Sequence, residues 1–183
     1  FKYRLINDHK YHLIDTGLKP NYYEIEHRML HGMFNMLKTF VEEESAWSTY
    51  IWSDRKDKFV PGREAGLAAL KWQKELVWKE DEIWEEDKKY LIGQPTDQAL
   101  TAKEIEELYL WWVDVYPNRP EPYDVYPDPD ETHYDDPMEM LARPMTDERK
   151  ARHEKARALE EQYENEDTEM LMRLIKIRGA LWT

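Results

Sequence analysis

The sequence predicts a mainly α-helical protein with three core helices and a long C-terminal helix. Apolar residues recur at intervals of three and four over long stretches, which is the spacing of one buried helix face. Only 6 of 183 residues are glycine, which leaves few of the tight turns that β-hairpins use. Globular domains usually contain ~100–150 residues, so we expect a single helical domain over residues 1–183.

Composition and charge exclude several classes of protein. The chain has 39 acidic and 26 basic residues and a formal net charge of −13, whereas nucleic-acid binding requires clustered lysine and arginine. The 8 Trp and 12 Tyr argue against a disordered chain. The absence of cysteine excludes disulfides, thiolate nucleophiles and cysteine-based zinc sites. No apolar run approaches the ~20 residues of a membrane-spanning helix. We therefore expect neither nucleic acid nor membrane as a direct partner.

Residues 1–21 are expected to form an extended N-terminal arm. Residues 2–7 and 10–15 repeat a short pattern with β-favouring Tyr and Ile, and the Asn7-Asp8 pair between them favours a turn. The sequence therefore predicts a small hairpin or two extended pieces. No apolar central region follows Phe1, so the chain as given shows no secretion signal.

The predicted helical core spans residues 22–116. A first helix over 22–47 is expected to be the most buried, and a second runs over 63–90 with a solvated acidic later half. A third begins at the Thr101/Glu104 capping box and ends at Pro117. The predicted inward stripes are Glu26, Leu30, Met33, Leu37, Phe40 and Val41, widened by Ile25, Met29 and Phe34; then Ala65, Ala69, Trp72, Leu76, Ile83 and Tyr90; then Ile105, Leu108, Trp112 and Val115.

Residues 117–145 form a proline- and tyrosine-rich acidic segment. Seven of the 10 Pro lie here, and neither a helix nor a central strand tolerates that density. We therefore predict a surface loop whose tyrosines pack partly against a surface. Residues 146–183 are expected to form the long fourth helix, which at ~30 residues spans ~45 Å. Its apolar end should dock on the chain's own body or on a second copy.

One stretch of the first helix has metal-ligand spacing. Glu24, His27 and His31 share one helical stripe, and two histidines at i, i+4 can jointly bind a divalent metal. The zinc-protease pattern requires glutamate directly after the first histidine, where this chain has Arg28. The di-iron pattern requires a second Glu-x-x-His pair. Hydrogen-bonded helix histidines beside the aromatic core are the structural alternative.

Two further hypotheses rest on the acidic residues. All-α nucleotide pyrophosphohydrolases hold Mg²⁺ with Glu-x-x-Glu and Glu-x-x-Asp pairs, which Glu104/Glu107 and Glu164/Asp167 match, although a glutamate-rich chain produces such pairs by chance. Alternatively, carboxylates along helices at 79–88 and 159–169 could mimic the DNA backbone and inhibit a host nucleic-acid-binding enzyme. The chain contains neither a nucleophile elbow nor a Walker loop nor a dinucleotide fingerprint.

Two stretches resemble uncharacterised tailed-phage proteins. The first runs from Asp15-Thr-Gly-Leu-Lys-Pro20 through the residues 26–34 to Phe40-Val-Glu42, and the second from Glu107-Leu-Tyr-Leu-Trp-Trp112 to Asn118-Arg-Pro-Glu-Pro122. They cover about a third of the chain and bring no catalytic residues with them. The resemblance implies a phage origin, and with it a location in the virion or the host cytoplasm.

Together these observations predict a non-enzymatic protein, either a virion component or an accessory protein, that acts through protein–protein contacts. We expect no cofactor, and a protein partner or self-association, of which a homo-oligomer is one form. Tryptophan and tyrosine are enriched where proteins bind one another. The residues expected to make the contacts are Trp111, Tyr123, Tyr126, Tyr134, Met170, Leu171, Leu174 and Ile175.

Overall fold

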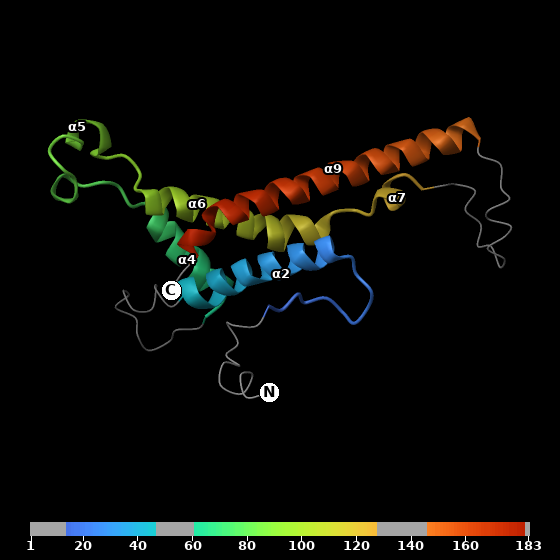
Figure 1. Cartoon of the computed structure of the whole chain (residues 1–183), viewed down its shortest axis with the longest axis horizontal. Coiled ribbons are helices and arrows are strands. Elements are labelled where there is room, and N and C mark those ends of the chain that lie inside the picture. The colour runs from blue at the N-terminus through green and yellow to red at the C-terminus, as the bar shows by residue number, and fades with distance from the viewer. Residues whose placement is uncertain (1–13, 47–60, 128–145, 182–183) are drawn as a thin grey trace, which may run out of the picture. The chain divides into compact units, whose positions relative to one another are not determined.

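A computed structural model describes residues 14–46, 61–127 and 146–181 (Figure 1). These residues form helices and no strand; a lone antiparallel bridge joins Val77 to Pro95. The prediction of a mainly α protein is confirmed. None of the helices in these ranges is long and apolar enough to cross a membrane.

The described residues group into two compact units, where the sequence suggested a single domain. The first unit takes the described parts of 1–117 and 171–183, and the second takes those of 118–170. The long C-terminal helix contributes residues to both. The predicted hairpin at the N-terminus falls on residues 1–13, which lie outside the described ranges, and residues 14–21 have no regular structure.

The first helix of the first unit is amphipathic. Helix α2 (Ile25–Thr39) continues as a π-helical stretch, η2 (Phe40–Ser45), so the predicted helix over 22–47 is confirmed in its main part. Leu30, Phe34, Leu37 and Val41 are buried. Ile25 and Met29, however, are 72% and 54% exposed. Their assignment to the core is wrong, because only one face of this helix is covered.

The second helix is much shorter than predicted. Helix α4 spans Arg63–Lys74, and the chain then forms a 3₁₀ turn, η4 (Glu80–Glu82), and one helical turn, α5 (Lys88–Leu91). A continuous helix to Tyr90 would place Asp81 beside Glu85 and Glu82 beside Glu86, and like charges at i, i+4 destabilise a helix. Trp72 and Tyr90, predicted in its core stripe, are 53% and 70% exposed.

Helix α4 lies directly against η2. A Cβ added at Gly66 would lie 2.2 Å from the carbonyl oxygen of Val41. Glycine is therefore required where the two backbones meet.

The third helix starts earlier than predicted. Helix α6 (Asp97–Leu110) begins after Thr96, whose Oγ1 accepts a 3.1 Å hydrogen bond from the Ala99 N–H. Thr101 therefore lies inside the helix, and the predicted capping box there is wrong. The helix continues through a π-helical stretch, η5 (Trp111–Val115), and a 3₁₀ turn, η6 (Tyr116–Asn118), which ends it close to the predicted Pro117.

Aromatic side chains join α2 to the end of α6. The Phe34 ring centroid lies 4.9 Å from that of Trp111 and 5.2 Å from that of Trp112. The buried Tyr109 hydroxyl donates a 2.7 Å hydrogen bond to Glu42, and burial together with this bond raises the pKa of Tyr109. Val115, predicted to point inward, is 48% exposed. Contacts between aromatic side chains thus hold α2 and the end of α6 together in the first unit.

The long C-terminal helix forms as predicted, as α9 (Asp147–Ile177), followed by a 3₁₀ turn, η7 (Arg178–Ala180). In the second unit, Arg119 pairs with Glu166 and Asp167 of α9 and lies over the Tyr163 ring. One helical turn, α7 (Pro122–Val125), occurs inside the predicted proline-rich loop. Proline is accepted there because it occupies the first position of the helix. The rest of that loop, 128–145, lies outside the described residues.

Candidate functional site

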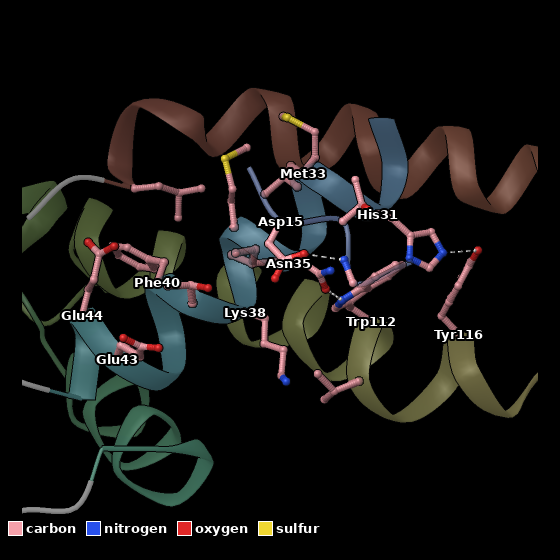
Figure 2. Close-up of a pocket in the computed structure, with 18 of the residues that line it drawn as sticks. Asp15, His31, Met33, Asn35, Lys38, Phe40, Glu43, Glu44, Trp112 and Tyr116 are labelled. Atoms are coloured by element: carbon pink, nitrogen blue, oxygen red, sulfur yellow. Dashed lines mark hydrogen bonds between the residues drawn. The ribbon is translucent and has the colours of Figure 1, made fainter. Parts of the chain in front are cut away.

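An open cleft of about 1190 Å³ lies in the first unit (Figure 2). Its described lining comes from four parts of the sequence: residues 15–17, residues between His31 and Glu44 of α2 and η2, residues 112–117, and the chain from Leu174 to Leu181. Helix packing rather than any local motif creates it.

The cleft has an apolar and adaptable lining. Met33, Met36, Phe40, Leu174 and Leu181 all contribute to it. Methionine is unbranched and polarisable, so its side chain adjusts to differently shaped partners. The lining can therefore adapt to apolar partners of different shapes and does not require one rigid ligand.

Helices α2 and α9 expose further apolar side chains. On α2, Met29 is 54% exposed, and on α9 Met172 and Ile175 are 52% and 36% exposed. These are individual exposed residues, and none of the three belongs to the cleft lining.

Charged side chains of both signs also line the cleft. Lys38 lies 3.8 Å from the Glu42 carboxylate, and Arg178 donates a 2.7 Å hydrogen bond to the Ile175 carbonyl. Glu43 and Glu44 lie together beside Phe40 (Figure 2). This mixture of signs does not concentrate charge for one small ion.

A histidine and aromatic side chains close one end of the cleft. The Tyr116 hydroxyl lies 3.4 Å from His31 Nε2, and the Trp112 indole donates a 3.0 Å hydrogen bond to Asn35 (Figure 2). The His31 ring also meets Trp112 edge-on, with the centroids 4.9 Å apart. These contacts fix the orientation of the imidazole.

The structure brings the predicted histidine pair together without completing a metal site. The rings of His27 and His31 lie 4.5 Å apart, and Tyr23 stacks on His27 at 5.4 Å. Burial and the neighbouring His27 lower the pKa of His31. Glu24, the third predicted ligand, is an exposed residue at the start of α2. Among the described residues, no three His, Asp or Glu side chains converge as metal ligands.

The first predicted Mg²⁺ pair is occupied by an arginine. Arg173 of α9 binds both oxygens of Glu104, at 2.7 and 2.9 Å, and also binds Glu107 at 2.7 Å. The guanidinium lowers the pKa of Glu104, and the carboxylates raise that of Arg173. A metal would have to displace this ion-pair cluster to reach the carboxylates.

The second predicted pair belongs to the other unit. Asp167 accepts a 2.5 Å hydrogen bond from Arg119. Glu164 is exposed, and its backbone carbonyl accepts the hydroxyl of Thr168 at 2.9 Å. Asp167 thus forms an ion pair between α9 and Arg119, and the Glu164 contact is a hydrogen bond within α9. The acidic stretch 79–88, expected as a helical phosphate mimic, is not one continuous helix.

The predicted interaction residues are distributed between core and surface. Trp111 is 5% exposed and belongs to the aromatic core, so it offers no free surface in this structure. Leu174 is likewise buried, whereas Tyr123 is 48% exposed. Tyr126, Met170 and Leu171 are half-buried, Ile175 lies at the surface, and Tyr134 is outside the described residues.

Sequence reasoning missed Asn35 and Arg173 as organising residues. Asn35 anchors Trp112 across 77 positions, and Arg173 reaches Glu104 across 69. Neither residue belongs to a local motif, so only the packed fold reveals the pairs. The exposed Trp84 was also missed, because it was placed within a continuous helix.

No protein family, curated protein or solved structure matches the chain. The fold and the site define an all-α protein with an open, methionine-lined cleft, in which Arg173 and Arg119 already bind carboxylates of both predicted Mg²⁺ pairs.

Proposed function

We propose that this chain is a non-enzymatic, phage-encoded protein, a virion component or an accessory protein, that acts by binding other proteins. The observation that carries the proposal is the open cleft with Met33, Met36, Phe40 and Leu181 in its lining. The phage origin rests on the sequence resemblance alone.

The chemistry of the cleft favours a protein segment as its occupant. Small-molecule sites usually enclose most of their ligand and fix it with a few convergent polar groups. Here four of the polar side chains in the lining contact one another: Asn35 accepts from Trp112, and Tyr116 contacts His31. The flexible thioethers offer dispersion contacts and no fixed hydrogen-bond pattern. An apolar helix face or an extended segment fits such a surface.

Ion pairing disfavours the enzymatic alternative. Phosphoryl chemistry in the pyrophosphohydrolase hypothesis needs carboxylates that are free to hold Mg²⁺. Arg173 binds both members of the first pair, and Arg119 binds Asp167 of the second.

Two assays on the chain test the proposal. The purified protein should turn over no nucleoside triphosphate with Mg²⁺ present, and it should contain no stoichiometric transition metal. Mass spectrometry of purified phage particles should find it in the virion if it is a component, or only in infected cells if it is an accessory. Mg²⁺-dependent turnover that is lost in the Glu104→Gln variant would overturn the proposal.

A further inference from the structure

The segment 76–96 forms a closed loop. Three backbone hydrogen bonds join its two ends: Trp78 N–H to the Gln94 carbonyl, Gly93 N–H to the Trp78 carbonyl, and Thr96 N–H to the Leu76 carbonyl, at 3.0, 3.0 and 3.1 Å. Figure 1 shows the loop, with α5 in it, extending away from α4 and α6. We call residues 76–96 the tryptophan loop.

The tryptophan loop presents an indole to solvent. Trp84 is 85% exposed, although large aromatic side chains are normally well buried. Its backbone is fixed, since the Trp84 carbonyl accepts the N–H groups of Asp87 and Lys88 at 2.9 and 3.2 Å. Lys88 forms ion pairs with Glu85 and Glu80 of the same loop, at 2.5 and 3.7 Å. An ordered, exposed tryptophan is typical of a binding hot spot.

Acidic residues flank Trp84 in the sequence. Six acidic residues lie between positions 80 and 87, against three lysines at 79, 88 and 89, one of which pairs inside the loop. The complementary surface is therefore cationic and has room for a flat aromatic ring.

The start of α9 has that chemistry. Residues 149–157 contain five Lys or Arg and one acid. Its exposed side chains on one broad face are Lys150, Ala151, Glu154, Lys155, Arg157 and Ala158. The spacing i, i+4, i+7 places Ala151, Lys155 and Ala158 in one row. The small alanines leave a shallow surface between cations, and a cation over the face of Trp is the strongest pairing of its kind.

We propose that the tryptophan loop of one copy docks on the basic face at the start of α9 of a second copy. Trp84 lies on the Ala151 and Ala158 methyl groups with Lys150 and Arg157 beside it, and the loop carboxylates face those cations. The inference goes beyond the proposed function, because it names a second copy as the partner of a surface other than the cleft. Because the two surfaces differ, the contact can repeat head to tail into a chain or ring.

Sedimentation of the full chain tests the contact. Wild-type protein should associate with rising concentration, and more weakly at high salt because charge pairs are screened. Trp84→Ala should weaken association about tenfold or more, as expected of a hot spot. Trp72→Ala is the matched control, since Trp72 is also exposed but lies outside the loop. That control should associate like wild type.

Mixing two variants gives the sharpest result. Trp84→Ala keeps its basic face, and the double variant Lys150→Glu/Arg157→Glu keeps its loop. Each alone should therefore stay monomeric at a concentration at which wild type associates. Together they should form a 1:1 dimer and nothing larger, with circular dichroism confirming that each is folded. Wild-type protein that stays monomeric up to about 100 µM, or a mixture that forms no dimer, overturns the inference. Since neither result touches the cleft, the proposed function would be tested separately by its own assays.

Discussion

His31 is a half-buried histidine of the first unit whose pKa the fold shifts. Its ring is half-buried against Trp112 and Tyr116, with His27 beside it. Burial first, and His27 second, lower its pKa from the ordinary value, while an interaction with the Thr16 backbone opposes them. The folded chain therefore holds this proton less readily than the unfolded chain does.

We predict that stability falls as the pH drops through the ordinary histidine value of about 6.5, because the unfolded state then binds the extra proton. The contribution is fully present above that pH and is lost below it. Urea midpoints measured from pH 8 to pH 5.5 should decline less steeply in His31→Gln than in wild type. Parallel curves for the two proteins would contradict this assignment.

At the scale of elements, the contact between α4 and η2 depends on Gly66. A methyl group there meets the Val41 backbone at 2.2 Å, and a backbone carbonyl cannot move aside as a flexible side chain can. We predict that Gly66→Ala lowers the free energy of unfolding by roughly 1–3 kcal/mol or more.

Gly179→Ala is the control for this substitution. No atom lies within 4 Å of its added Cβ, so denaturant melts should show little change. Equal stability of Gly66→Ala and wild type would show that α4 and η2 are not in contact as described.

The ion pairs of Arg173 join the end of α9 to α6. Removing the guanidinium leaves Glu104 and Glu107 as neighbouring unpaired carboxylates. We predict that Arg173→Gln lowers the unfolding free energy by roughly 0.5–1 kcal/mol, a value kept small because solvent reaches the cluster. The exposed pair Arg63–Asp114 is the comparison, and Arg63→Gln should cost less.

Acid should act on the same pairs. The lowered pKa of Glu104 means that its contribution is present above its unfolded value and is lost as the pH falls through the folded one. Wild type and Arg173→Gln should therefore converge in stability at low pH. A constant difference between them down to pH 2 would contradict the pairing.

Element types could be read from the sequence, but several boundaries could not. Long 3.6-residue periods identified α2 and α6, and α9 was predicted because no helix breaker interrupts the chain before Gly179. The period through Trp72, Ile83 and Tyr90 suggested one helix where the chain forms α4 and a closed loop, because like charges outweigh an incomplete apolar stripe. The third helix starts after Thr96 and not at Thr101, because the Thr101/Glu104 pair has the pattern of a capping box although it lies inside the helix.

The candidate site was less predictable than the fold. The His27/His31 spacing placed two rings correctly, since i, i+4 neighbours share a helix face. The cleft itself draws Met33 and Leu174 from positions 141 residues apart in the sequence. Their meeting depends on tertiary packing, for which the chain carries no local signal.

At the scale of the whole molecule, the net charge and the exposed side chains indicate that the protein binds partners at particular regions of its surface. A charge of −13 opposes indiscriminate aggregation and makes contacts sensitive to salt. The methionine-lined cleft and the exposed Trp84 of the tryptophan loop are then the places where partners of suitable charge can bind.

The most direct test of the central claim, that the cleft binds protein, is site-specific photo-crosslinking in cells that make the chain. A photoreactive side chain replaces Met36 in the cleft, and in the control it replaces the exposed Leu100 of α6. We predict one defined protein adduct at position 36, absent from the control and lost when Phe40 is changed to Lys. Equal labelling at the two positions, or no adduct at position 36 in cells that contain the folded chain, would contradict the account.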